Sequence, residues 1–312
     1  MTEAVPPADF QSYYGRAVLK SPVWEWKIPA YLFTGGLAAG AAVLGAGADV
    51  TRRPALRRAG RLGALGGLVA STYFLVADLG RPARFHHMLR VAKPSSPMSV
   101  GTWILMAFAP GAGVAAVAEV MPRKLRRTPP GRLLGLAARP AGLSAAGVAP
   151  ALASYTAVLL SQTAVPAWNE AHPYLPFVFT GSAAASGGGL GMVLAPIGEA
   201  GPARRLGVAG ALLETGAARV LDQRLGLVGE TYRNRKRRWA EALTLGGAAG
   251  TLLARRSRVA AVASGLALLA GSALQRFGIF EAGVASTRDP KYVVVPQRER
   301  LRRRQAEQVP AS

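Results

Sequence analysis

Eight stretches of this sequence are apolar over roughly the length that a helix needs to cross a membrane, and they limit the fold more than any other feature. A helix needs about 20 apolar residues to span the hydrocarbon core of a bilayer. The stretches cover residues 28–50, 61–79, 97–120, 141–165, 174–197, 206–225, 239–254 and 259–280. The sequence therefore predicts an all-α integral membrane protein with eight transmembrane helices.

The charged residues are segregated from these stretches. Half of the residues are hydrophobic although the net charge is +22, a combination that is typical of neither soluble nor disordered chains. Lys and Arg cluster in short runs beside the apolar stretches: TRRPALRR (51–58), PRKLRR (122–127), YRNRKRR (232–238) and RERLRRR (298–304). Basic runs also neutralise nucleic-acid phosphates, but runs placed between membrane-length stretches favour topological anchors. We expect a multi-pass protein of the cell membrane that contacts lipid and no nucleic acid.

The same basic runs bear on orientation. By the positive-inside rule, the short basic loops after the first and third stretches belong in the cytoplasm, which places residues 79–97 and 166–173 outside. The basic loop before Trp239 and the basic tail fall on the opposite side and favour the reverse. The pattern leans towards an outward-facing 79–97 loop.

One internal repeat divides the sequence. YLFTGGLAAGAA (31–42) aligns with FVFTGSAAASGG (177–188) at a spacing of 146 residues, although Gly- and Ala-rich stretches also resemble each other by chance. The repeat predicts two parallel four-helix bundles, at 28–165 and 166–280. Residues 1–27 form a polar segment without the features of a secretory signal, so we expect the first stretch to remain in the mature protein. Residues 281–312 form a basic tail with a strand-like PKYVVVP.

The sequence has no cysteine and three histidines. His86 and His87 are adjacent and His172 lies in another loop, whereas a transmembrane haem typically needs histidines on facing helices. The composition therefore predicts no haem and no iron–sulfur cluster in this protein, so any electrons must come from a partner or a diffusible carrier.

The segment DLGRPARFHHMLRVAKPSSPMSVGTW (78–103) is a polar site between two apolar stretches. Asp78 and Arg81 have the spacing of a helical ion pair, which would lower the pKa of Asp78. Serine is common at the N-cap of a helix and proline at its first position, so Ser96 and Pro97 predict that a helix begins here. These residues are also explained if they only fix a loop and start a helix.

The DLGRP and SPMSVGTW motifs, together with WEWKIPAYLFTGGLAAG (24–40), SYTAVLL and PAWNE, resemble the NrfD/polysulfide reductase membrane-subunit family. The closing QRFGIFEAG and DPKYVVVPQRERL look like the subtype found beside formate-dehydrogenase-like enzymes. The resemblance implies a haem-free, quinone-reactive membrane anchor that passes electrons between a four-cluster iron–sulfur subunit and menaquinone or ubiquinone. Substrate chemistry would belong to a separate molybdopterin subunit.

The resemblance also implies site residues. Tyr155 looks like the family's quinone contact, since a phenol can donate a hydrogen bond to a quinone carbonyl; it is equally explained as a core tyrosine. The expected quinone site comprises Tyr155, Trp26, Asp78 and Arg81, with Asp78 and Glu25 as the proton route, although Trp26 also suits an interfacial aromatic belt. The expected docking residues are Arg84, Ser96, Met98, Ser99, Trp168 and Asn169.

The second half carries ionisable residues inside its apolar stretches, namely Glu214, Arg219, Asp222, Glu241 and Arg276. Such residues are functional by default, which indicates proton translocation, unless they pair among themselves on different helices. These charges, the Gly-rich stretches and the repeat also fit an ion or small-solute transporter without a redox role. A purely structural anchor is the third hypothesis.

Overall fold

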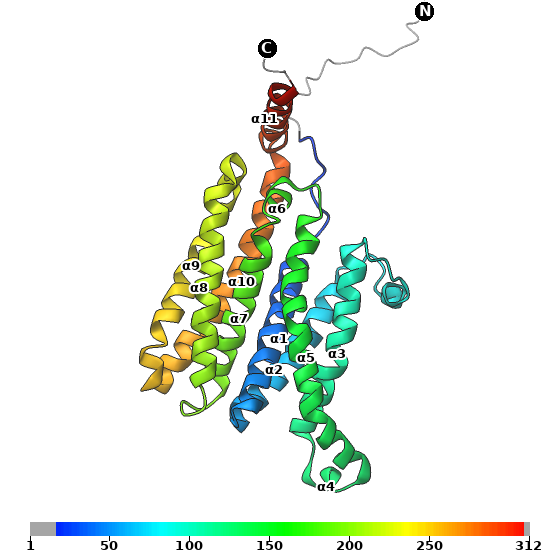
Figure 1. Ribbon diagram of the computed structural model, residues 1–312, viewed down its shortest axis with the longest axis vertical. Helices are drawn as coiled ribbons and strands as arrows, with labels where there is room; N and C mark the ends of the chain where they lie inside the picture. Colours follow the sequence, from blue (N-terminus) through cyan, green and yellow to red (C-terminus); the bar gives the residue numbers. More distant parts are fainter. Residues whose placement is uncertain (1–16, 309–312) are drawn as a thin grey trace, which may run out of the picture.

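The computed structural model describes residues 17–308 and places most of them in helices (Figure 1). The long helices are α1 (Lys27–Val50), α2 (Pro54–Ala77), α3 (Pro97–Val120), α5 (Pro129–Ser161), α7 (Leu175–Leu194), α8 (Gly201–Arg224), α9 (Arg235–Gly250), α10 (Arg258–Arg288) and α11 (Lys291–Gln308). The short ones are η1 (Pro82–Arg90), α4 (Arg123–Arg126), α6 (Pro166–Glu170), η2 (Gly226–Tyr232) and η3 (Leu253–Arg255). The all-α prediction is confirmed for this part of the protein. Parts of the predicted polar N-terminal segment (1–16) and of the tail (309–312) lie outside the described residues.

Six of these helices are long and apolar enough to cross a membrane: α1, α2, α3, α5, α7 and α10. Helices α8 and α9 occupy the positions of the sixth and seventh predicted stretches, but charged residues interrupt α8 and α9 is only 16 residues long. The structure thus confirms a multi-span helical protein, while the count of eight transmembrane helices stays a prediction.

Two local predictions are wrong. The segment between the third and fourth apolar stretches (121–140), expected as a basic loop, is helical from Pro129 onwards. Proline suits the first helical positions, and the Thr128 hydroxyl accepts a hydrogen bond from the Gly131 amide at 3.3 Å. The strand-like PKYVVVP begins helix α11, which ion pairs attach to the rest of the molecule: Lys291 with Glu230 at 3.1 Å and Arg300 with Glu170 at 2.5 Å.

The two copies of the repeat contact each other where α1 packs against α7. Gly40 lies so close to α7 that a Cβ atom there would overlap the Ala183 carbonyl, and a Cβ on Gly187 would overlap the backbone of Gly40. Both helices run in the same direction (Figure 1). On one side of this contact α1, α2, α3 and α5 pack together, and on the other α7, α8, α9 and α10 do so. We call these the N-terminal and C-terminal helix groups.

The connections between helices gather at two ends of the molecule (Figure 1). The upper end of the figure carries the start of α1, η1, α6, η2 and α11, and it includes the 78–97 segment. The lower end carries the connections after α1, α3, α7 and α9, in which basic residues far outnumber acidic ones. The upper end therefore contains the candidate site, and the lower end contains the short basic loops.

Candidate functional site

A pair of buried tyrosines lies near the upper end of the N-terminal helix group. The hydroxyl groups of Tyr31 on α1 and Tyr155 on α5 hydrogen-bond each other, and both side chains are buried. Helix α3 closes the site, since a Cβ atom on Gly101 would overlap the Tyr155 ring. The Ser71 hydroxyl of α2 donates to the Tyr31 carbonyl at 3.4 Å. Four helices therefore fix two phenols that can share one proton and offer another to a ligand.

The start of α3, the helix that contacts Tyr155 at Gly101, holds the 91–94 segment in place. The Val91 carbonyl accepts hydrogen bonds from the Ser99 hydroxyl at 2.7 Å and from the Trp103 indole at 3.1 Å, four residues apart on one helical face. The segment and the helix border an apolar groove of about 530 Å³, which Ile104 on α3 and Val148 on α5 also line. An apolar molecule in the lipid can approach α3 along this groove.

The rim above the tyrosines carries Asp78, Glu25 and Lys27. Asp78 follows the last residue of α2 and lies seven residues, about 10 Å, above Ser71 along the helix axis. Its carboxylate faces the backbone of Glu25 and the charge of Lys27, and Lys27 pairs with Glu25 at 3.1 Å. Partial burial raises the pKa of Asp78 above its ordinary value, although Lys27 acts in the opposite direction. Asp78 therefore keeps its proton to higher pH than a solvated aspartate.

The predicted pairing of Asp78 with Arg81 is wrong. Helix α2 ends at Ala77, so the helical spacing that would bring the two side chains together does not apply. Within residues 17–308, Asp78 forms no ion pair with Arg81, whose side chain is exposed. The pKa of Asp78 shifts upwards through burial and not downwards through Arg81. Trp26 is also largely exposed and meets the Phe74 ring edge-on, which suits a residue at the membrane interface.

The six predicted docking residues divide into two sets. Arg84, Met98 and Asn169 are exposed at the upper end, and Ser96 is half-buried there. Ser96 precedes the first residue of α3 as predicted, but its side chain makes no capping hydrogen bond. Ser99 is buried because its hydroxyl holds the 91–94 segment.

Trp168 is the clearest departure from the expected docking surface. Its side chain is fully buried, donates from Nε1 to the Ile279 carbonyl at 2.9 Å and packs so closely on α10 that Gly283 has no space for a Cβ atom. Trp168 therefore joins α6 to α10, and a partner is unable to reach its indole ring.

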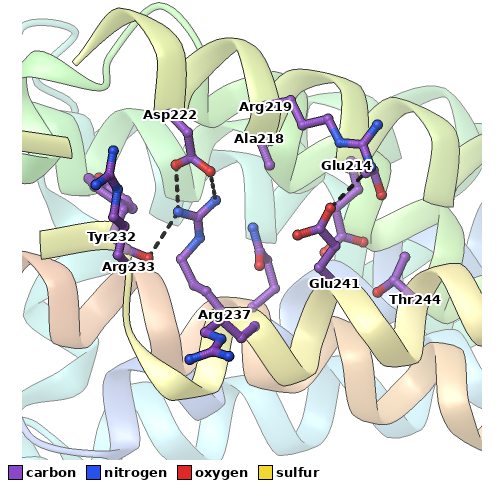
Figure 2. A pocket seen from close by; sticks show the side chains of 12 residues that line it. Glu214, Ala218, Arg219, Asp222, Tyr232, Arg233, Arg237, Glu241 and Thr244 are labelled. Atoms are coloured by element: carbon purple, nitrogen blue, oxygen red, sulfur yellow. Dashed lines mark hydrogen bonds and ion pairs between the residues drawn. The ribbon is translucent and has the colours of Figure 1, made fainter. Parts of the chain in front are cut away.

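The ionisable residues of the C-terminal helix group surround a cavity of about 370 Å³ between α8, η2, α9 and α10 (Figure 2). Arg219 on α8 pairs with Glu241 on α9 at 3.3 Å, and both side chains are largely exposed. Arg237 forms a two-pronged pair with Asp222 at 2.7 and 3.3 Å. The alternative prediction, that these groups pair between helices, is therefore confirmed for Arg219.

Glu214 lies deeper in the same cavity and is only 3% exposed. One carboxylate oxygen, Oε2, has no hydrogen-bond partner among the described residues, and neither do Nε and Nη1 of the buried Arg276. Arg276 donates from Nη2 to the Phe179 carbonyl at 2.8 Å, and its guanidinium stacks on the Phe179 ring at 3.6 Å. Buried polar atoms without partners are typical of sites that hold water.

Sequence reasoning missed Tyr31 as a member of a site. Tyr31 stands within the WEWKIPAYLF motif, where it fits an interfacial aromatic belt equally well. Its hydrogen bond to Tyr155 joins residues 124 positions apart, which no local spacing reveals. Arg276 was expected from its place inside the last apolar stretch, where an arginine needs a partner on another helix, and the Phe179 carbonyl of α7 is that partner.

The apolar helices and the polar groups kept between them define a multi-pass helical membrane protein. The family model described as Polysulphide reductase, NrfD matches residues 17–223, so the protein belongs to the NrfD family. The match covers the tyrosine pair, the rim and Glu214. The C subunit of polysulfide reductase from Wolinella succinogenes is 30% identical over 178 residues, which cover 53% of the present sequence and 56% of that relative. The aligned region thus spans little more than half of that relative.

Proposed function

We propose that this protein is the quinone-reactive anchor of a redox complex in the plasma membrane. It would pass electrons between a partner's iron–sulfur clusters and menaquinone or ubiquinone, with substrate chemistry in a third, molybdopterin-containing subunit. The formate-dehydrogenase-like subtype is part of the same proposal and rests on the residues of the C-terminal region. The proposal includes all eight long helices of the two helix groups as membrane spans.

The observation that carries the proposal is the hydrogen-bonded pair of Tyr31 and Tyr155. Reducing a quinone to a quinol consumes two electrons and two protons, so the site needs a hydrogen-bond donor at the carbonyl and a proton supply. Tyr155 would donate to a quinone carbonyl, and Tyr31 would hold the Tyr155 hydroxyl in position. Asp78 and Glu25 on the rim would resupply protons, and the groove beside α3 would admit the isoprenoid quinone from the lipid.

The proposal is tested by titrating the purified protein in lipid nanodiscs with short-chain quinone analogues while following tryptophan fluorescence. We expect saturable quenching in the wild type and weakened quenching in Tyr155→Phe. Linear, unsaturable quenching in both proteins would contradict a quinone site. A saturable response that is the same in both would place the site elsewhere.

Asp78→Asn is expected to slow quinone reduction by the complex about 10-fold, because the asparagine cannot deliver protons. The raised pKa of Asp78 predicts a wild-type rate that holds at low pH and falls as pH rises through that pKa, when the carboxyl loses its proton. Asp78→Asn should lack this fall in rate with rising pH. Steady-state rates across the pH range measure both effects, with Glu299→Gln on the exposed face of α11 as the control. An unchanged pH profile in Asp78→Asn would exclude the rim from proton delivery.

A second candidate function, proton conduction through the C-terminal helix group, is favoured by the cavity around Glu214. The unpartnered Oε2 of Glu214 provides a place for water in the cavity that the exposed Arg219–Glu241 pair also lines. In proteoliposomes, Glu214→Gln is expected to keep quinone turnover but to lower the number of protons moved per electron. Glu241→Gln, on the exposed side of the same cavity, should retain the wild-type ratio. Equal ratios in Glu214→Gln and the wild type would leave Glu214 with a structural role only.

A further inference from the structure

The lower end of the N-terminal helix group contains a cavity of about 330 Å³ that none of the functions above uses. It lies between the ends of α1 and α3 and the beginnings of α2 and α5. Two acidic residues, Asp49 and Glu119, line it together with five arginines: Arg57, Arg61, Arg126, Arg132 and Arg139. We call this cavity the basic hollow.

The two carboxylates of the basic hollow lie against three of its arginines, although Asp49 Oδ2 forms no hydrogen bond within the described residues. Glu119 Oε1 accepts hydrogen bonds from Arg57 Nε at 2.7 Å and Arg61 Nη1 at 3.0 Å. Asp49 lies 3.4 to 3.5 Å from Arg57, Arg61 and Arg139. Five guanidinium groups against two carboxylates leave an excess of positive charge, and Arg126 and Arg132 have no carboxylate partner among the described residues.

The remaining arginine donors point to a missing acceptor. Arg61 is 8% exposed, and its Nε has no hydrogen-bond partner within residues 17–308. Arg126 donates only to the main-chain carbonyls of Ala118, Glu119 and Met121, and Arg132 forms no ion pair in the described part of the protein. A buried donor needs a hydrogen-bonded partner, which Arg61 Nε lacks, and the exposed Arg132 adds a charge without an ion pair, so an anion in the hollow would be bound by both.

The surroundings of the hollow identify the kind of anion. Large apolar side chains are exposed in the same turns of α3 and α5, namely Val117 (47%), Val120 (53%), Leu133 (69%) and Leu136 (77%). In a membrane-spanning helix such residues face lipid. Gly135 lines the hollow, and a Cβ atom there would meet nothing within 4 Å, so this side is open. A charged headgroup site beside lipid-facing apolar surface matches an amphiphilic anion.

We propose that the basic hollow binds the phosphate of an anionic phospholipid, with its acyl chains against the exposed apolar residues of α3 and α5. The phosphate oxygens would accept hydrogen bonds from Arg61, Arg132 and Arg139. The planar guanidinium group is well suited to binding phosphate. Such a lipid would hold the ends of α1, α2, α3 and α5 together at the end of the molecule opposite to the tyrosine pair.

The test compares thermal unfolding midpoints of delipidated protein with added phosphatidylglycerol, phosphatidylcholine or inorganic phosphate. Phosphatidylglycerol is expected to raise the midpoint of the wild type by about 5 °C, because a ligand that binds only the folded state stabilises it. The double variant Arg132→Gln/Arg139→Gln should lose most of this shift. The control Arg58→Gln/Arg127→Gln removes two exposed arginines from the same end of the molecule, outside the hollow. It should retain the full shift with phosphatidylglycerol.

Gly135→Leu provides a second variant, which leaves every arginine in place and adds a bulky side chain at a residue that lines the hollow. It should also lose the phosphatidylglycerol shift. An equal shift with phosphatidylcholine, or a full shift in the double variant, would overturn the proposal. A full shift of the unfolding midpoint with inorganic phosphate alone would mean that the hollow binds a free anion, and it would overturn the proposal that the ligand is a lipid.

Discussion

Replacing Tyr155 by phenylalanine is expected to lower quinone-linked electron transfer by the assembled complex about 100-fold, the effect of losing one placed hydrogen-bond donor at a reacting oxygen. The ring, which α3 contacts at Gly101, stays in place, so the packing of the helices should survive. The buried Tyr31 hydroxyl loses its partner, which adds a modest loss of stability of about 1 to 2 kcal/mol. Steady-state turnover with a quinone analogue measures the first effect and thermal unfolding the second.

Tyr73→Phe is the matched control, because Tyr73 is 67% exposed on α2 and belongs to no site. It should change neither the turnover nor the unfolding midpoint. If Tyr155→Phe turns over quinone at the wild-type rate in an intact complex, the protein is a structural anchor and the tyrosine pair serves only packing.

Gly40→Leu is expected to lower the free energy of unfolding by about 3 kcal/mol or more, because its side chain would have to enter the space of the α7 backbone. Side chains at a membrane helix interface gain little from burying apolar surface away from lipid, so close backbone approach contributes much of the association of helices. The contact joins the two helix groups, and the variant should therefore yield little folded protein. Size-exclusion chromatography and the unfolding midpoint measure this loss.

Gly47→Leu on the same helix is the control for α1 itself. Gly47 is exposed, and a Cβ atom there meets nothing within 4 Å, so this substitution should be tolerated. Equal losses in both variants would mean that leucine disturbs α1 wherever it is placed, and that the contact with α7 is not the cause.

The sequence predicted the features that depend on local pattern. Helix α3 has the predicted bounds, because Pro97 starts it and an uninterrupted apolar run follows. The family was predicted from motifs that lie on α1, the 78–103 segment and α5, and the family match confirms it.

Features that depend on distant contacts were not predictable in the same way. Trp168 stands in a loop sequence typical of a surface, yet α10 buries its indole and accepts its hydrogen bond. Asp78 and Arg81 have helical spacing, but the helix ends before either residue. Local spacing cannot show where a helix ends under tertiary packing, nor which helix lies opposite a given residue.

The central claim is that this protein connects an iron–sulfur partner with membrane quinone. The most direct measurement is affinity purification of the tagged protein in mild detergent, with mass spectrometry of its companions and analysis of iron, molybdenum, tungsten and extractable quinone. We predict an iron–sulfur subunit and a molybdopterin subunit in fixed ratio, with iron and quinone present. A protein that purifies alone, free of iron and quinone, would contradict the account and would favour a transporter.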